Sequence, residues 1–424
     1  MSLNSLIDSP KELLELINAC LKPKEIEKKE FGEVFTPVNL VNDMLDKLPN
    51  DVWSNKDLKW FDPCCGMGNF PVIIYLRLMI GLKNVIVDEK ERKKHILEKM
   101  IYMCELNKKN VLITKQIFDI NNEYKLNIHQ GDFLQFNPSK IFGLKMFDII
   151  VGNPPYNASG TKSTGNTIWQ LFVINSFYIV NKLGYIVFIH PTGWRKPPSD
   201  KSKSKNLFTM MTHDNNMLYL EMHNAKDGMK IFNCGTKYDF YVVQIKNDAN
   251  LQTLIVDEHG TKLSLKLKSY CFLPNYNIAL FDKIYNPICD ISNIMYSRSA
   301  YGSDKKHISK IKTDIYKFTV IHSTNKSGCR YLYSNNVDNG FYGVKKVIFG
   351  DSGINEPIID NDGKLLLSEH AMAIPIVNNN GTQIYNALKS NIFAEFIKSC
   401  MWSNFQLDWR LFTYLRKDFY NEFL

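Results

Sequence analysis

The sequence lacks a Cys-x-x-Cys pair, a long apolar segment and a signal peptide. Its nine cysteines are scattered, which removes support for a zinc ribbon or a thioredoxin-like redox site, and we expect no bound metal. The longest apolar segments are interrupted by Asn181 and Lys182 and are shorter than the ~20 residues that a membrane span requires. Residues 1–4 lack the basic start of a signal peptide. We therefore expect a reducing, cytoplasmic location, in a prokaryotic cell or in the host of a virus, and no membrane partner.

A strong excess of either charge is also missing. The formal net charge is +9 over 424 residues, with 45% hydrophobic and 22% charged residues. This composition is globular, and the length suits two or three domains. A mild positive charge suits a polyanionic partner such as a nucleic acid, but it equally describes a surface that is simply rich in lysine and asparagine. Charge alone does not separate these two interpretations.

The order of apolar segments predicts three parts: a helical extension over residues 1–30, an α/β domain over 31–248 and a further domain over 249–424. In the α/β domain, short apolar runs alternate with amphipathic stretches, which is typical of a sheet with crossover helices. The predicted strands are residues 58–61, 101–104, 126–129, 147–151, 185–189, 218–222 and 240–245. The predicted helices are residues 70–80, 91–100, 111–118 and 169–181. Ligands bind such sheets at the carboxyl ends of their strands.

A glycine-containing loop follows the first predicted strand. Asp62 opens this loop, Gly66 and Gly68 lie within it, and a predicted helix comes next. The glycines let the backbone approach a ligand closely, and the helix N-terminus offers unpaired N–H groups. An acidic residue at the start of the loop argues against a phosphate and for a cationic group, such as the ammonium of a methionine moiety. The Gly-x-Gly pattern by itself is weak, because many tight turns contain it.

Two more acidic residues end the second and third predicted strands. Glu105 has the position of a carboxylate that accepts hydrogen bonds from ribose hydroxyls, although a helix-capping or solvated glutamate is the alternative. Asp132 is followed by Phe133, so that the carboxylate can accept from an adenine amino group while the phenyl ring packs on the base. Three acids at three successive strand ends favour a nucleoside-containing cofactor more than any one of them does.

The fourth predicted strand leads into the sequence Asn153-Pro154-Pro155-Tyr156. An exocyclic amine on a heteroaromatic ring is a poor nucleophile, because its lone pair is delocalised into the ring. The Asn153 side-chain oxygen and the Pro154 carbonyl can accept both amino hydrogens and direct the lone pair toward a methyl donor. Proline fixes φ and supplies no competing N–H donor, and Tyr156 offers a face on which a base can stack. No general base is obvious, and a rigid polyproline turn is the structural alternative.

These motifs occur in one order, which resembles that of the gamma-class DNA adenine-N6 methyltransferases of restriction–modification systems. The motifs are Phe31-Gly32-Glu33-Val34-Phe35-Thr36-Pro37, Asp62-Pro63-Cys64-Cys65-Gly66-Met67-Gly68, Glu105, Gly131-Asp132-Phe133 and Asn153-Pro154-Pro155-Tyr156. The resemblance implies a Rossmann-like, seven-stranded α/β sheet that binds S-adenosylmethionine, followed by a C-terminal mixed α/β domain that recognises the DNA target. It departs from the family's pattern at Met67 and in the doubled cysteine.

The resemblance also implies roles for the residues. Phe35, Thr36 and Pro37 would close over the methionine part of the cofactor, which the loop residues Asp62, Pro63, Cys64, Gly66 and Gly68 would hold. Glu105 would bind the ribose, and Asp132 and Phe133 the adenine, with Pro155 lining the same pocket. The catalytic residues would be Asn153, Pro154, Pro155 and Tyr156. The implied enzyme is an adenine-specific, site-specific DNA methyltransferase.

The expected substrate is an adenine flipped out of double-stranded DNA. Tyr156 and Phe232 would flank the base, although Phe232 is equally compatible with an ordinary core position. The expected phosphate contacts are Arg195, Lys196, Lys201, Lys203 and Lys205. In the C-terminal domain, the candidate phosphate contacts are Lys305, Lys306, Lys345 and Lys346. A separate cognate restriction endonuclease is a further expected partner.

Other functions remain open from the sequence. Release-factor glutamine and ribosomal guanine-N2 methyltransferases share the Asn-Pro-Pro-Tyr tetrad, so RNA or protein methylation is the enzymatic alternative. The leading Phe35-Thr36-Pro37 segment and the long C-terminal domain favour DNA. A non-catalytic DNA-specificity subunit is the alternative from the binding class, and it would not need the tetrad together with the three acids.

Overall fold

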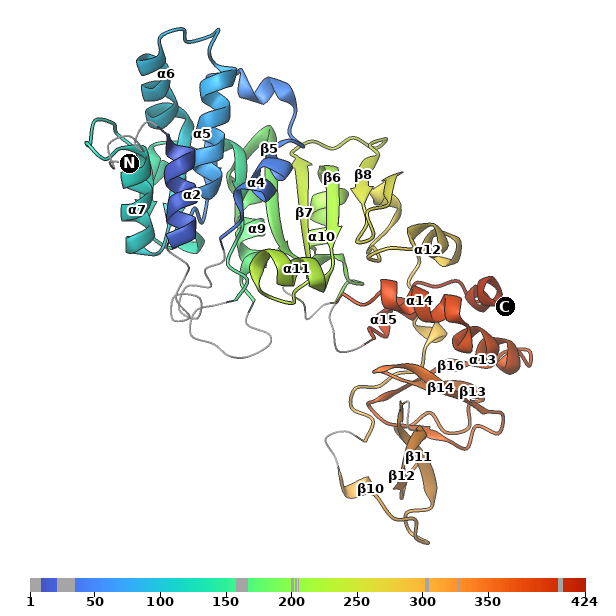
Figure 1. The fold of residues 1–424 in the computed structure, drawn as a ribbon. Helices are drawn as coiled ribbons and strands as arrows, with labels where there is room; N and C mark the ends of the chain where they lie inside the picture. The colour runs from blue at the N-terminus through green and yellow to red at the C-terminus, as the bar shows by residue number, and fades with distance from the viewer. Residues whose placement is uncertain are drawn as a thin grey trace. The chain divides into compact units, whose positions relative to one another are not determined.

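A computed structural model gives the fold of the chain (Figure 1). The structure describes residues 9–20, 35–157, 167–199, 202, 204, 206–301, 305–325, 328–402 and 407–424. Residues 31–34 of the leading motif and Lys201, Lys203 and Lys205 therefore lie outside the described residues, as does the side chain of Lys305. The chain divides into two compact units: unit 1 comprises Met1–Trp194 and Asp200–Lys268, and unit 2 comprises Arg195–Ser199 and Ser269–Leu424.

A mixed β-sheet runs through unit 1. The strands of its described part are arranged in the order β3-β2-β1-β4-β5-β7-β6-β8-β9. They are β1 (Trp60–Asp62), β2 (Ile101–Glu105), β3 (Asn127–Gln130), β4 (Phe147–Gly152), β5 (Val180–Pro191), β6 (Asn216–His223), β7 (Tyr238–Gln244), β8 (Thr253–Val256) and β9 (Lys262–Leu265). β1 to β5 run parallel to one another, and β7 runs antiparallel to both β5 and β6. The seven predicted strands are confirmed, and β8 and β9 extend the sheet beyond them.

The helices of unit 1 follow the predicted pattern. They are α2 (Pro10–Cys20), α4 (Val38–Leu45), α5 (Asn69–Gly81), α6 (Glu89–His95), α7 (Lys108–Phe118), α8 (Pro138–Phe142), α9 (Trp169–Ile179), α10 (Leu207–Thr212) and α11 (Ala225–Phe232). Short 3-10 or π turns are η1 (Asn50–Trp53), η2 (Ile96–Met100), η3 (Phe133–Gln135), η4 (Thr192–Arg195) and η5 (Leu267–Ser269). Each of the four predicted helices is present, one of them divided into α6 and η2.

Alternating side chains place two apolar layers on the sheet. Trp60 and Ile149 face the cluster that contains the buried residues of α2, α4 and α5. Phe61 points to the opposite face, where its ring stacks on Phe147 with the centroids 4.3 Å apart and tilts against Phe133 at 5.9 Å. This alternation follows from the pleat, because successive strand residues point to opposite faces. Because β1 to β4 are parallel, their carboxyl ends lie at the same edge of the sheet.

The β4 residue Asp148 supports the opposite end of the sheet, where β1 and β4 begin. Its Oδ2 accepts a hydrogen bond from the Lys59 N–H at 2.7 Å, and its Oδ1 accepts one from Asn181 Nδ2 at 2.7 Å. Asp148 thus joins the residue before β1, the start of β4 and the start of β5 in one hydrogen-bonded group.

We expect Asp148→Ala to lower the free energy of unfolding by about 1–3 kcal/mol, because it leaves two partly buried donors without this acceptor. Urea denaturation measures the effect, and binding of a cofactor analogue well below the melting temperature should be unchanged. Asp57→Ala, at an exposed position of the same connection, is the matched control. Equal stability of the two variants would contradict the assigned role.

Unit 2 contains two smaller sheets. One has the order β10-β12-β11-β15 and the other β14-β13-β16. The strands are β10 (Ile308–Ser309), β11 (Phe318–Asn325), β12 (Gly328–Ser334), β13 (Lys346–Gly350), β14 (Gly353–Asp360), β15 (Leu366–Leu367) and β16 (Ala371–Pro375). The helices and turns are α12 (Ile278–Ile284), η6 (Ile291–Asn293), η7 (Lys305–His307), α13 (Gly381–Lys389), α14 (Asn391–Ser399), α15 (Arg410–Thr413) and η8 (Phe419–Phe423). Unit 2 is thus mixed α/β, as expected for the C-terminal region.

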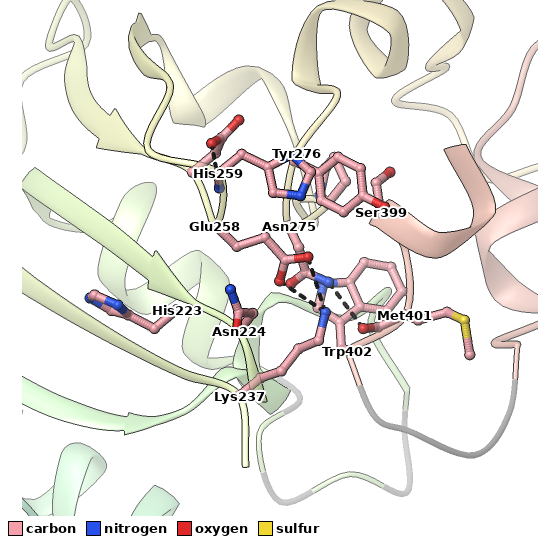
Figure 2. A network of polar contacts seen from close by, with 12 residues as sticks. His223, Asn224, Lys237, Glu258, His259, Asn275, Tyr276, Ser399, Met401 and Trp402 are labelled. Atoms are coloured by element: carbon pink, nitrogen blue, oxygen red, sulfur yellow. Dashed lines mark hydrogen bonds and ion pairs between the residues drawn. The ribbon is translucent and has the colours of Figure 1, made fainter. Parts of the chain in front are cut away.

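Polar groups inside unit 2 are bound to backbone carbonyls. Trp402 Nε1 donates to the Leu273 carbonyl at 2.8 Å, and Asn275 Nδ2 donates to the Met401 carbonyl at 3.0 Å; the side chains of Trp402 and Asn275 are drawn in Figure 2. The compact unit begins at Ser269, whereas the sequence division fell at residue 249, since β8 and β9 pair with the sheet of unit 1. Where the functional domains divide stays a prediction.

One of the predicted phosphate contacts of unit 2 has a different position. Lys346 is fully buried, and its Nζ donates to Asp360 Oδ2 at 2.8 Å and to the carbonyls of Phe341 and Val344. A lysine that is enclosed and fully hydrogen-bonded offers no charge to a phosphate at the surface, so the expectation for Lys346 is corrected. Its neighbour Lys345 is exposed.

Candidate active site

A cavity of about 270 Å³ lies in unit 1 at the carboxyl ends of the parallel strands. It is lined by residues from all five motifs and from the start of α9. The lining residues are Phe35, Thr36, Pro63, Cys64, Cys65, Gly66, Asn69, Phe70, Glu105, Leu106, Asn110, Gly131, Asp132, Phe133, Leu134, Asn153, Pro154, Pro155, Tyr156, Ile168 and Phe172. The folded chain therefore brings the leading segment, the glycine loop, two of the three acids and the whole tetrad to one place.

The two glycines of the loop have backbone conformations that other residues rarely adopt. Gly66 has φ +55° and Gly68 has φ +94°, and Gly68 is the residue that precedes α5. A Cβ at Gly66 would lie 3.3 Å from the Phe35 ring, and one at Gly68 would lie 3.3 Å from Thr114. The loop is thus enclosed on both sides, and glycine is required by both the dihedral angle and the space.

Glu105 fixes the glycine loop through its carboxylate. Oε2 accepts a hydrogen bond from the Gly66 N–H at 2.9 Å, and Oε1 accepts one from the Asn107 N–H at 2.7 Å. Each carboxylate oxygen has a further lone pair, so Glu105 can still accept from the two hydroxyls of a ribose in the cavity. Asp132 has an equivalent position after β3, where its Oδ1 accepts from the Leu134 N–H at 2.9 Å.

Asp62, the first of the three acids, does not line the cavity. It is 2% exposed, and its Oδ1 accepts a hydrogen bond from the Cys64 N–H at 3.0 Å. Burial raises the pKa of Asp62 from its usual 3.8 to about 8, and the nearby charge of Glu105 adds to the rise. The carboxyl is therefore neutral at pH 7 in the chain without a bound cation, and it supports the loop from behind.

This raised pKa predicts a dependence of stability on pH. The stability that the protonated carboxyl contributes is fully present below the unfolded-state value near 3.8 and is lost as the pH rises toward about 8. We expect the melting temperature without ligand to fall more steeply from about pH 5 to about pH 9 in the unaltered protein than in Asp62→Asn, whose amide keeps the acceptor for Cys64. Exposed Asp57→Asn is the control, and parallel curves for all three proteins would refute the prediction.

The Asn153 side chain is oriented by the leading segment. Its Nδ2 donates to Thr36 Oγ1 at 3.1 Å, so the planar amide directs Oδ1 away from Thr36. The Cys64 thiol donates to the Asn153 carbonyl at 3.4 Å, and burial raises the pKa of this thiol well above its usual range, which keeps the donor proton in place. Asn153 is held from two sides, by the leading segment and by the glycine loop.

The rest of the tetrad forms part of the cavity wall. Pro154 and Pro155 line it, and so does Tyr156, whose hydroxyl is buried and has no hydrogen-bond partner among the described residues. Burial raises the pKa of Tyr156 far above its usual range, so the phenol is neutral at any physiological pH. A neutral aromatic ring at the wall offers a stacking surface for a planar ligand.

Besides Asp62, five of the predicted binding residues do not line this cavity: Pro37, Gly68, Phe232, Arg195 and Lys196. Pro37 and Gly68 flank residues that do, at the ends of the leading segment and of the glycine loop. Phe232, at the end of α11, packs edge-on against Tyr238 with centroids 5.1 Å apart and joins the main core of unit 1. Lys196 is partly buried in unit 2, where burial lowers its pKa.

The structure corrects the expectation for Arg195. Its side chain is fully buried in unit 2, and the guanidinium donates to the carbonyls of Leu273 and Pro274 and to Asn275 Oδ1. With its donors engaged by the protein interior, Arg195 has a structural role and presents no charge to a DNA phosphate. Its neighbour in sequence, Trp194, is likewise buried and donates to Asp239 in unit 1 at 2.9 Å.

Residues that sequence reasoning missed complete the site. Ile168 and Phe172 bring the start of α9 to the cavity, and the Phe172 ring packs on Phe133 with centroids 5.2 Å apart. α9 is apolar all round, so its sequence did not reveal the face that meets the cavity. Asn69 was also missed, although its position directly after Gly68 was a usable signal.

No group of described residues has an arrangement that could hold a metal ion, and no helix in the described ranges is long and apolar enough to cross a membrane. Residues 21–177 match the family described as N-6 DNA Methylase. The resemblance to N-6 DNA methylases is confirmed. The matched segment contains the cavity wall from Phe35 to Phe172.

Two curated relatives of the N-6 DNA methylase segment are similar to this chain. An uncharacterized adenine-specific methylase of Mycoplasma pneumoniae is 32% identical, and the match covers 40% of this chain and 57% of that protein. The type II methyltransferase M.VspI of a Vibrio species is 26% identical, with 39% of this chain and 38% of that protein covered. The chain thus spans about half of these relatives' lengths.

Solved structures share the fold at low sequence identity. The type IIL restriction-modification enzyme MmeI in complex with DNA is 13% identical, has a TM-score of 0.56 and covers 94% of this chain and 70% of its own. The protein in a DrdV–DNA complex is 12% identical and has a TM-score of 0.53; the match covers 99% of this chain and 59% of that chain. The expected Rossmann-like α/β fold with an additional C-terminal mixed α/β region is confirmed.

Proposed function

We propose that this chain is a site-specific methyltransferase that uses S-adenosylmethionine to methylate N6 of an adenine flipped out of double-stranded DNA. One observation carries the proposal: a single cavity is lined by Glu105, Asp132 and the complete Asn153-Pro154-Pro155-Tyr156 tetrad. The match to N-6 DNA methylases and the printed names of the two relatives support the same activity.

The residues of the cavity fit S-adenosylmethionine, which when bound supplies an electrophilic methyl group. Glu105 and Asp132 offer oxygen acceptors at neighbouring strand ends, suited to ribose hydroxyls and to an adenine amino group. Phe133 offers an apolar surface beside Asp132, and the enclosed Gly66 lets the backbone approach the amino-acid end closely. Thr36 and Phe35 close the cavity over the loop.

The tetrad would act on the base. The Asn153 Oδ1 and the Pro154 carbonyl would each accept one hydrogen of the adenine amino group, which removes the nitrogen lone pair from conjugation and orients it. Tyr156 would stack on the extruded ring. Positioning by rigid acceptors lowers the barrier without reorganisation at the moment of transfer. The Cys64 thiol and the Thr36 hydroxyl hold Asn153 in this orientation.

Unit 2 would recognise the DNA target. Exposed Lys306 and Lys345 are its proposed phosphate contacts, and partly buried Lys196 is a weaker candidate. Phe232 stays a proposed second wall for the flipped base, reached only if its packing on Tyr238 changes. A separate cognate endonuclease is a proposed partner.

The activity is tested by incubating the purified protein with radiolabelled S-adenosylmethionine and DNA, RNA or release factor. We expect label in DNA only, at adenine N6, and sequencing of the modified DNA should show one recognition sequence. Label in RNA or protein but not in DNA would overturn the proposal in favour of the enzymatic alternative. Specific DNA binding without any transfer would favour a specificity subunit.

A further inference from the structure

Asn69 presents a buried oxygen acceptor to the cavity. It is the first residue of α5, it is 5% exposed, and it lines the cavity beside the glycine loop. Its Nδ2 donates to the Thr36 carbonyl at 2.7 Å, whereas its Oδ1 has no hydrogen-bond partner among the described residues. A buried polar atom without a partner is unfavourable, so an acceptor left open at a cavity wall points to a ligand that supplies the donor.

The orientation of this amide is determined by Thr36. If the amide were turned over, Oδ1 would face the Thr36 carbonyl at hydrogen-bond distance, and two acceptors would oppose each other. The Thr36 carbonyl therefore holds Nδ2, and Oδ1 is left as an acceptor for a ligand. Only a group with an N–H or O–H can satisfy it.

The surroundings of Asn69 select a particular donor. N–H groups in the first turn of a helix have no intrahelical acceptor, so the start of α5 suits a carboxylate. An acceptor oxygen beside those donors suits an ammonium. Both groups occur together in a zwitterionic amino acid. Gly68 directly precedes Asn69, and Phe35, whose ring lies against Gly66 of the same loop, also lines the cavity.

We propose that Asn69 Oδ1 accepts a hydrogen bond from the α-ammonium of the amino-acid group of the cofactor, a role that rests on the proposed use of S-adenosylmethionine. Asp62, the acid first expected to meet this ammonium, does not line the cavity and its Oδ1 is bonded to the Cys64 N–H. Asn69 reaches the cavity where Asp62 does not, and a charge-assisted hydrogen bond from an ammonium compensates the desolvation of both groups.

The same geometry connects cofactor binding with the catalytic side chain. The Thr36 carbonyl holds Asn69, and the Thr36 hydroxyl holds Asn153. A ligand that fixes Asn69 therefore also fixes Thr36, and with it the direction of the Asn153 amide. Thr36 is in this sense a positioning residue shared by the cofactor and base subsites.

A comparison of two ligands tests the proposal by calorimetry in the absence of DNA. The ligands are S-adenosylhomocysteine and its deamino analogue, in which hydrogen replaces the α-amino group. The unaltered protein should bind S-adenosylhomocysteine at least tenfold more tightly than the analogue. Asn69→Ala should lower the affinity for S-adenosylhomocysteine about tenfold and change the affinity for the analogue by no more than about twofold. The preference for S-adenosylhomocysteine should therefore disappear.

One control and a second variant complete the test. Asn121→Ala, at an exposed position in unit 1, should bind both ligands as the unaltered protein does. Asn69→Leu, the second variant, keeps nearly the shape of asparagine without an acceptor; it covers the case in which Asn69→Ala does not fold, and it should also lose the preference. An equal loss of affinity for both ligands in a folded variant would overturn the role of Asn69. An unchanged preference for S-adenosylhomocysteine over the analogue would overturn it as well. Binding with these preferences but no methylation of DNA would instead reject the proposed function and leave the ammonium site standing.

Discussion

Asn153→Ala is expected to reduce methyl transfer to DNA by about 10²–10³-fold while changing the affinity for S-adenosylhomocysteine by no more than about twofold. Removal of one preorganised hydrogen-bonding group from a transition-state site typically has a cost of this size. The substitution removes an acceptor for the adenine amino group and leaves Pro154 as the other. Glu105 and Asp132, the proposed acceptors for the cofactor, keep their backbone hydrogen bonds.

The structure also predicts graded losses of methyl transfer in variants of Asn153 and of its partner Thr36. Thr36→Val removes the hydroxyl that accepts from Asn153 Nδ2 but keeps the backbone carbonyl, so transfer should fall by less than in Asn153→Ala. Asn153→Asp keeps an oxygen acceptor, and the Thr36 hydroxyl can reverse its role and donate, so this variant should retain more activity than the alanine variant. Single-turnover transfer measured with saturating cofactor and DNA separates these effects from binding.

The control for this series is Asn121→Ala, which should transfer at the rate of the unaltered protein. Full activity in Asn153→Ala would reject the tetrad mechanism. A parallel loss of cofactor affinity and of transfer would show instead that Asn153 supports the cavity as a whole.

The fold of unit 1 was accessible from the sequence because its central strands are short, apolar and separated by helical stretches. β4 is an example: residues 147–151 were predicted and Phe147–Gly152 is observed. β8 and β9 were missed because each has only four residues, some of them exposed, and β8 joins the sheet by pairing with β6, which lies well before it in the sequence. β9 then pairs with β8. An edge pairing of this kind has no local signal.

The candidate site was predictable where function depends on position along a strand. Glu105 and Asp132 were placed from the strand ends alone, and both line the cavity. Asp62 was not placed correctly relative to the cavity, because the direction of a side chain at the end of a strand depends on the following turn, where the Cys64 N–H binds Asp62. Asn69 directly follows Gly68, which is a signal in the sequence, but the acceptor that its Oδ1 offers is apparent only from the hydrogen bond that its Nδ2 makes to Thr36.

Burial by residues that are distant in the sequence explains why two charged residues were assigned incorrectly. Arg195 and Lys346 both belong to basic stretches, and such stretches suggest a surface in contact with phosphates. The carbonyl groups that bind the Arg195 guanidinium come from residues 273–274, far from it in sequence. Sequence can locate a charge, but only packing decides whether that charge is available to a partner.

Glu105→Gln is expected to lower the affinity for S-adenosylhomocysteine about 10–100-fold, although the change only replaces one carboxylate oxygen with an NH₂ group. Both carboxylate oxygens accept backbone hydrogen bonds, from Gly66 and from Asn107. A glutamine can accept only one of them and must turn its NH₂ toward the other N–H. Loss of a satisfied, partly buried donor costs about 1–3 kcal/mol, and the ribose also loses a charged acceptor.

A second ligand separates these two causes. Calorimetry with S-adenosylhomocysteine and its 2′-deoxy analogue should show a preference for the ribose form in the unaltered protein and a smaller one in Glu105→Gln, because the charged acceptor is gone. Glu123→Gln, an exposed site before β3, is the matched control and should bind both ligands normally. If Glu105→Gln lowers the affinity for both ligands equally, Glu105 only supports the glycine loop. If it lowers the affinity for neither ligand, Glu105 is not the ribose acceptor. A reduced preference together with an overall loss is what a carboxylate shared between the loop and the ribose requires.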